Sequence, residues 1–129
     1  MQDLESIAKI SIDCGFHLHK DIGPGLLESV YEILLFESLK AKGLSVERQK
    51  IIPITFRGRV LNEAFCADLI VEKRLLLELK STERHSPVHA KQLLTYLRLM
   101  NLPLGFLMNF GAATFKEGVK RLANNYFRG

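Results

Sequence analysis

Three charged side chains interrupt a stretch of sequence whose composition is otherwise typical of buried β-strands. The stretch runs from Phe65 to Lys80, and the charges within its apolar runs belong to Asp68, Glu78 and Lys80. Side chains alternate between the two faces of a strand, so Glu78 and Lys80 are expected on the same face. Charged groups placed among apolar strand residues are typical of functional sites.

A short polar segment, Glu72–Arg74, divides the stretch and predicts a β-hairpin with a three-residue turn. In that register Val71 pairs with Leu75, and Asp68 lies directly opposite Glu78. Opposed residues of an antiparallel pair have Cβ atoms roughly 4.5–5.5 Å apart. The sequence therefore predicts that two carboxylates face each other on one side of the sheet.

Two facing carboxylates repel each other, and the repulsion grows in a half-buried site. Lys80 supplies one compensating positive charge, and a divalent metal with oxygen ligands would supply the rest. Without a metal, at least one of the two carboxylates is expected to have a raised pKa. The alternative is that these are solvated charges on the outer face of an amphipathic hairpin. The apolar run Leu75–Leu77 suits a strand that is covered on both faces, which favours the buried site.

The same residues match a known signature. Asp68 followed by Glu78-Leu79-Lys80 resembles the Asp…Glu-x-Lys motif of the PD-(D/E)xK nuclease superfamily. Three further segments resemble motifs of the GxxExxY proteins, a small-domain branch of that superfamily. In chain order they are Gly25–Tyr31, Pro87–Leu97 and Asn109–Gly111. The resemblance extends from about Ile10 to Asn124, and four motifs in the family's order are far more specific than a lone Asp…Glu-x-Lys.

This resemblance implies both a fold and a chemistry. It implies an α/β fold with a restriction-endonuclease-like core, in which helices flank a mixed central sheet of about four to five strands, as one domain over residues 1–129. It also implies a metal-dependent phosphodiesterase, a nuclease acting on nucleic acid. Asp68 and Glu78 are the expected metal ligands, Glu28 is expected to reach the metal directly or through water, and Lys80 is expected to assist attack by water. Because the ligand set is oxygen-only, the metal is expected to be Mg²⁺ or Mn²⁺.

A polar stripe on the helix that follows Lys80 supplies further candidates. His89, Gln92 and Tyr96 lie three and four residues apart, hence on one face of that helix. Because the helix begins near the end of the charged strand, we expect Gln92 to position phosphate or water. We expect Tyr96 and His89, together with Tyr31 on an earlier helix, to contact substrate or to support the catalytic residues.

Hydrophobic periodicity predicts the elements that position these residues. Helices are expected over residues 4–20, 26–41, 87–100 and 116–126, and strands over residues 46–49, 51–56, 60–71, 75–80 and 105–110. Pro53 cannot donate a ladder hydrogen bond, so its strand is expected at a sheet edge or at a bulge. The order of the elements predicts an antiparallel meander followed by a strand–helix–strand unit, and hence a mixed sheet.

The composition is that of ordinary globular protein with one hydrophobic core, at 129 residues, 47% hydrophobic and 25% charged. A net charge of +4 permits a nucleic-acid partner without requiring one. No apolar stretch reaches the roughly 20 residues of a membrane span, and the first residues lack the layout of a signal peptide. We therefore expect a cytoplasmic protein with no membrane association.

Two other functions compete with the nuclease. The first is a catalytically silent nuclease fold that acts as an adaptor or binding module for a protein or a nucleic acid. The second is metal-dependent chemistry on a smaller phosphate compound. The residues leave open whether the nucleic acid is DNA or RNA, and whether the chain forms a homodimer or binds a protein partner.

Overall fold

The computed structural model describes residues 3–127 of the chain. Its elements, in chain order, are α1 (Leu4–Ile22), α2 (Glu28–Ala41), β1 (Val46–Phe56), β2 (Arg59–Val71), β3 (Leu75–Lys80), α3 (Pro87–Met100), β4 (Leu104–Asn109), α4 (Phe115–Gly118) and β5 (Val119–Ala123). Across these residues no helix has the length and the apolar character that crossing a membrane requires.

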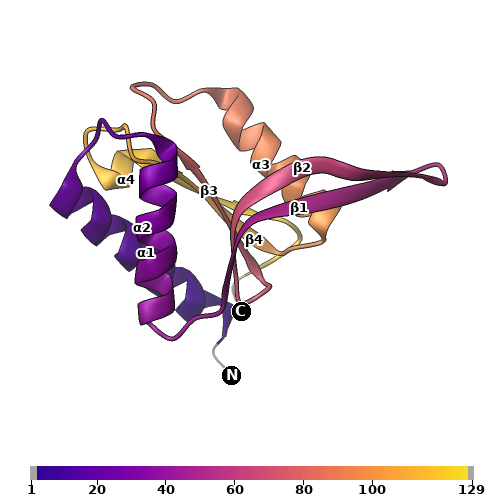
Figure 1. The fold of residues 1–129 in the computed structure, drawn as a ribbon, viewed down its shortest axis with the longest axis horizontal. Coiled ribbons are helices and arrows are strands. Elements are labelled where there is room, and N and C mark those ends of the chain that lie inside the picture. The colour runs from indigo at the N-terminus through magenta and orange to yellow at the C-terminus, as the bar shows by residue number, and fades with distance from the viewer. Residues whose placement is uncertain (1–2, 128–129) are drawn as a thin grey trace.

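The strands form one mixed sheet in the order β1-β2-β3-β4-β5 (Figure 1). β1, β2 and β3 make an antiparallel meander, β3 and β4 are parallel, and β5 is antiparallel to β4. A parallel pair needs a crossover connection, which α3 provides. The prediction of a mixed α/β sheet flanked by helices is confirmed.

Apolar side chains cover the sheet on both faces. On one face, Leu75 and Leu77 of β3 join a core cluster with residues of α1 and α2. On the other face, Leu76 packs with Leu93 and Leu97 of α3. Alternate residues of β3 therefore enter opposite cores, as expected for a central strand that is buried on both sides.

The C-terminal segment corrects one prediction, because residues 116–126 do not form a closing helix. The helix α4 ends at Gly118, and Val119–Ala123 instead pairs with β4. This pairing satisfies backbone groups on the edge of β4 that a helix would have left without partners. A Cβ atom on Gly118 would lie 2.2 Å from the carbonyl oxygen of Asn109, so glycine is needed where the chain turns back against β4.

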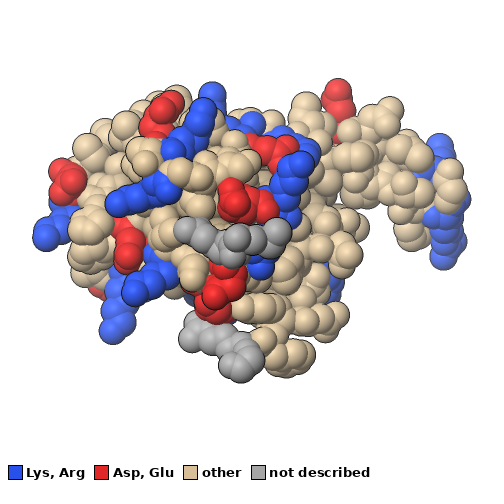
Figure 2. All heavy atoms as spheres, turned by 90° about the horizontal axis from the view of Figure 1, so that it is seen from below, with Lys and Arg blue, Asp and Glu red and all other residues tan. Residues whose placement is uncertain are grey.

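β1 and β2 continue beyond the body of the sheet as a two-stranded projection, which stands out in both Figure 1 and Figure 2. We call residues 53–64 the arm. Among the described strands, β3 pairs with β2 only over Leu69–Val71, so the two arm strands pair only with each other. Arg57 and Gly58 close the arm with φ angles of 50° and 79°, as a type I′ hairpin turn requires. Pro53 lies at a register shift of the edge strand β1, as predicted.

Candidate functional site

Asp68 and Glu78 lie where β2 and β3 separate. The hairpin has the predicted register, and its last backbone pair is Leu69 opposite Leu77. The next position in that register brings Asp68 opposite Glu78. There the two strands are joined by hydrogen bonds from backbone N–H groups to side-chain carboxylates. The N–H of Asp68 donates to Glu78 Oε2 at 2.8 Å, and the N–H of Leu79 donates to Asp68 Oδ2 at 2.9 Å. Each carboxylate is therefore held by the opposite strand.

The two carboxylates and Lys80 share one face of the sheet, as the sequence predicted. Ile70, two residues after Asp68, and Leu76, two residues before Glu78, both belong to the core cluster beneath α3. Side-chain alternation places Asp68, Glu78 and Lys80 on this same face. The charge of Lys80 acts on both carboxylates and lowers the pKa of each.

Burial makes Glu78 difficult to ionise. Burial, followed by the negative charge of Asp68, raises the pKa of Glu78 from 4.5 to about 8. Burial also raises the pKa of Asp68, the hydrogen bond from Leu79 lowers it, and the charge of Glu32 raises it. A raised pKa was expected for at least one carboxylate, and burial contributes more to it than repulsion between the carboxylates does. Near neutral pH and without a cation, the pair therefore retains a proton, held mainly by Glu78.

A cavity of about 390 Å³ beside Asp68 connects the pair to α2. Glu28 lies in the lining of this cavity but is exposed, at the first position of α2. Its charge raises the pKa of Asp68, but by less than burial or the charge of Glu32 does. Glu28 thus borders the site that it was predicted to enter, and within the described residues it forms no hydrogen bond with Asp68 or Glu78.

Glu32, one helical turn later, is more closely connected to the pair, and it was not predicted from the sequence. Glu32 is buried and accepts hydrogen bonds from Arg48 Nη1, at 3.2 Å, and from the side-chain amide of Gln49. The same amide donates to Asp68 Oδ1 at 3.3 Å. Gln49 therefore bridges a carboxylate of α2 and a carboxylate of β2. The available signal was the four-residue spacing from Glu28, which places Glu32 on the same helix face.

Gln49 adopts an unusual backbone conformation for a strand residue. Its φ angle is 52°, in the left-handed region that residues other than glycine rarely adopt. It lies opposite Asp68, between the backbone pairs that Arg48 and Lys50 make with β2. Such strain persists only where the surrounding structure enforces it, and it is frequent at functional sites.

Tyr96 approaches the carboxylates from α3. Its ring stacks on Phe65 of β2, with ring centroids 4.0 Å apart and an interplanar angle of 9°. Burial raises the pKa of Tyr96, and the negative charges of Glu78 and Asp68 raise it further. The phenol is therefore within electrostatic reach of the pair.

The other two polar residues of the α3 stripe are less engaged. Gln92, one turn before Tyr96, is exposed, and His89 is partly exposed. Within the described residues neither side chain forms a hydrogen bond. Both are free to meet a substrate that approaches along α3, and their roles stay predictions.

The hydroxyl of Tyr31 bonds the backbone of the loop before α2. It is fully buried and stacks on Phe110, with centroids 4.7 Å apart and an interplanar angle of 8°. Its hydroxyl donates to the Gly23 carbonyl at 2.6 Å and accepts from the Leu26 N–H at 3.1 Å. Tyr31 thus fixes the loop that leads into α2, and with it the position of Glu28.

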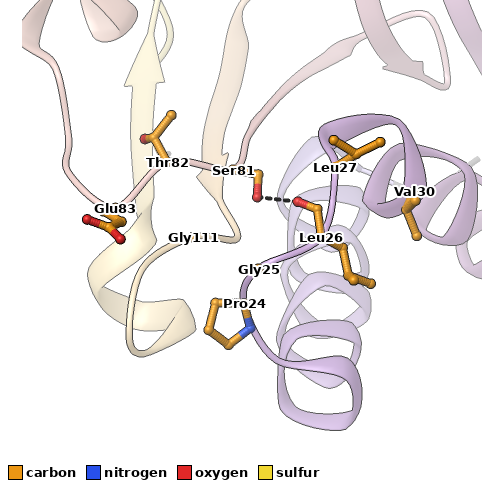
Figure 3. Close-up of a pocket in the computed structure, with 9 residues that line it drawn as sticks. All are labelled: Pro24, Gly25, Leu26, Leu27, Val30, Ser81, Thr82, Glu83 and Gly111. Atoms are coloured by element: carbon orange, nitrogen blue, oxygen red, sulfur yellow. Dashed lines mark hydrogen bonds between the residues drawn. The ribbon is translucent and has the colours of Figure 1, made fainter.

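The same loop borders a cavity of about 730 Å³ (Figure 3). Its lining consists of Pro24, Gly25, Leu26, Leu27, Val30, Ser81, Thr82, Glu83 and Gly111. The Ser81 hydroxyl donates to the Leu26 carbonyl at 2.6 Å and joins the segment after β3 to the segment before α2. Ser81 directly follows Lys80, and Leu27 directly precedes Glu28, so this cavity adjoins the charged site.

Replacing Tyr31 by phenylalanine tests its structural role. Tyr31→Phe leaves a backbone carbonyl and a backbone N–H without their buried partner, so we expect the free energy of unfolding to fall by about 1–3 kcal/mol. Urea denaturation should show a lower midpoint with an unchanged slope. Tyr126→Phe is the matched control, since it removes a hydroxyl bonded to Glu5 nearer the surface. A loss for Tyr31→Phe no larger than that for Tyr126→Phe would contradict the anchoring role.

The donor set suits an oxygen-preferring divalent cation. Asp68 and Glu78 offer two carboxylates, and the N–H of Leu79 points toward Asp68. The carbonyl of a strand residue points to the same side as its N–H. The carbonyl oxygen of Leu79 is therefore expected to point toward Asp68, between β2 and β3, as a third oxygen donor. Within residues 3–127 no three His, Cys, Asp or Glu side chains converge closely enough to hold a metal ion as they stand. The two carboxylates are therefore the preformed part of the site, and Glu28 lies at its rim.

Comparisons with known proteins agree with this geometry. The family model of the PD-(D/E)XK nuclease superfamily matches residues 5–122, a range that contains Asp68, Glu78 and Lys80. Searches of curated proteins and of solved structures returned no match. The mixed five-stranded sheet with its flanking helices is consistent with the restriction-endonuclease-like fold. The chain therefore belongs to the PD-(D/E)XK nuclease superfamily.

Proposed function

We propose that the protein hydrolyses phosphodiester bonds in nucleic acid, with a divalent cation held by Asp68 and Glu78. The observation that carries the proposal is the facing carboxylate pair at the separation of β2 and β3, with Lys80 on the same face. Membership of the superfamily supports nuclease-like function and nucleic-acid binding in general. The raised pKa of Glu78 adds support, because a cation would relieve the same repulsion that now retains a proton.

The cation would be Mg²⁺ or Mn²⁺. Nucleases of this superfamily generally use divalent metals. Asp68, Glu78 and the Leu79 carbonyl provide oxygen donors only, which these two ions prefer. Glu28 would complete the set from the rim of the cavity, most simply through a water molecule. When bound, the cation supplies a Lewis acid that lowers the pKa of water and neutralises charge on the phosphate.

The chain's own residues supply the remaining chemistry. Lys80 orients the attacking water and stabilises negative charge that develops on the phosphate oxygens, because its ammonium lies on the same face as the carboxylates. Gln92 positions phosphate or water from the exposed face of α3. Tyr96, stacked on Phe65, limits the site on that side and keeps the carboxylates partly shielded from solvent.

Within the superfamily we assign the chain to the GxxExxY branch. The supporting residues are Gly25, Glu28 and Tyr31, in the spacing that gives the branch its name. The structure offers a reason for the spacing. Gly25 has a φ angle of 110°, Tyr31 ties down the loop that contains it, and Glu28 then begins α2 beside Asp68.

The proposal is tested by cation binding and cleavage together. Mn²⁺ should raise the melting temperature of the wild-type protein, and Mg²⁺ or Mn²⁺ should support cutting of plasmid or single-stranded substrates. Asp68→Asn removes one charge of the pair, so the shift caused by Mn²⁺ should largely disappear, while the cation-free protein becomes slightly more stable. Wild-type protein that gains no stability from Mn²⁺ and cuts no nucleic acid would instead support the catalytically silent adaptor.

A further inference from the structure

The arm, residues 53–64, is exposed over most of its length. Beyond the body of the sheet it is a bare two-stranded ribbon, with solvent on both faces. Phe56, Val60 and Leu61 are 65%, 59% and 61% exposed, although large apolar side chains are usually buried. A ribbon with such side chains has a surface suited to contact with another molecule.

The end of the arm carries two positive charges that form no ion pair with the described part of the chain. Arg57 lies in the turn and Arg59 begins β2. Within residues 3–127 no carboxylate lies within salt-bridge distance of either guanidinium, whereas Arg48 and Arg121 both have such partners. Figure 2 shows the basic end standing clear of the body, and Glu63, the acidic residue of the arm, lies nearer the body along β2. A polyanion is the partner that this charge distribution fits.

The arm is poorly suited to pairing with the edge of a second copy. Pro53 cannot donate a ladder hydrogen bond, and a register shift interrupts β1 at this point. Arginine side chains at the tip further discourage edge-to-edge pairing of identical strands. These features favour a partner that accepts the ribbon as a whole, with its side chains and not its backbone edge in contact.

We propose that the arm lies in the major groove of double-stranded DNA, with Arg57 and Arg59 on its phosphates. This inference rests on the proposed nuclease function and specifies its substrate class. The major groove of B-form DNA, about 12 Å wide, admits a two-stranded β-ribbon. The corresponding groove of A-form RNA is deep and narrow, so RNA duplexes are excluded by shape.

The length of the arm relates its tip to the carboxylate site. Asp68 and Gly58 lie on the same pair of strands, ten residues apart. At 3.2–3.4 Å per residue, the tip lies roughly 33 Å from Asp68 along the ribbon. A ribbon that lies in the major groove follows the inclined path of the groove around the duplex. The two arginines would therefore contact the duplex several base pairs from the phosphate that is cut.

Binding without divalent ions isolates the arm from catalysis. The probes are a fluorescent DNA duplex of about 30 base pairs and a single strand of the same length, which has no major groove. The double variant Arg57→Gln/Arg59→Gln should bind the duplex on the order of tenfold more weakly. Its affinity should also depend less on salt, with the log–log slope smaller by about 2, since two phosphate contacts are lost. Its affinity for the single strand should differ little from that of the wild type.

Lys9→Gln/Lys20→Gln on α1 is the matched control, because it removes the same charge from exposed positions away from the arm. The inference is overturned if this control loses as much affinity as the arm variant. Equal losses of affinity for single-stranded DNA or for an RNA duplex would also overturn it. So would a wild-type dimer in sedimentation that Leu61→Ser dissociates, since a second copy would then cover the arm.

The two proposals fail in different ways. Arm-dependent duplex binding without any metal-dependent cleavage would leave the arm assignment standing and refute the nuclease. Cleavage of nucleic acid by a protein whose duplex binding ignores Arg57 and Arg59 would refute the arm assignment alone.

Discussion

Lys80→Ala is expected to slow metal-dependent cleavage of nucleic acid by roughly 10²–10³-fold, the effect of removing one strong electrostatic stabiliser of a transition state. Lys80 shares a face with Asp68 and Glu78, and its charge acts on both of them. Its ammonium would stabilise charge that develops as water attacks, whereas the carboxylates would hold the cation. The rate should therefore fall much more than the affinity for the cation.

Single-turnover cleavage and thermal melting with Mn²⁺ separate these effects. The rate constant should fall, while the Mn²⁺-induced rise in melting temperature stays close to that of the wild type. Lys73→Ala is the matched control, since Lys73 is exposed in the turn at the opposite end of β3. A parallel loss of rate and Mn²⁺ stabilisation in Lys80→Ala would show that the lysine supports the fold or the cation and not the reaction.

The facing carboxylates were predictable because two local rules determine them. A three-residue turn fixes which residues of β2 and β3 are opposite, and side-chain alternation fixes their face. Asp68 and Glu78 could therefore be paired from the sequence alone, and the observed register agrees. Local rules of this kind require no knowledge of distant segments.

The positions of the residues that support the two carboxylates depend on how distant segments pack, so local rules could not predict them. Gln49 reaches Asp68 and Glu32 only because β1 lies beside β2 and α2 packs nearby. The local spacing in α2 indicated Glu28, but packing buries Glu32 and leaves Glu28 exposed. The prediction of a closing helix over residues 116–126 was wrong for a similar reason. Val119–Ala123 forms a strand only because the edge of β4 is available for pairing.

Without divalent ions, the free energy of unfolding is expected to fall as the pH rises from about 4.5 to about 8. Burial and the charge of Asp68 raise the pKa of Glu78 from 4.5 to about 8, so the folded protein binds this proton more tightly than the unfolded chain. Stability that depends on the proton is fully present below the unfolded pKa and is lost as the pH passes through the folded pKa. The total change is on the order of a few kcal/mol.

Glu78→Gln should remove most of this dependence, because glutamine stays neutral and can still accept the hydrogen bond from the Asp68 N–H. Near pH 8 the variant should be more stable than the wild type, and near pH 4.5 the two should be similar. Urea denaturation in a chelator across this range measures the effect. Glu37→Gln, at an exposed position of α2, should leave the profile unchanged. A wild-type profile that is flat or rises with pH would contradict the buried pair.

A bound cation should reverse this pH dependence of the free energy of unfolding. Mn²⁺ and the proton compete for the same pair of carboxylates, so the stabilisation by Mn²⁺ should be small near pH 4.5 and largest near pH 8, where Glu78 ionises. Glu78→Gln should lose this gain at every pH, because only one charged carboxylate remains. If Mn²⁺ stabilised wild type and variant equally, the ion would bind elsewhere on the protein, and the pair would be a structural feature of the hairpin alone.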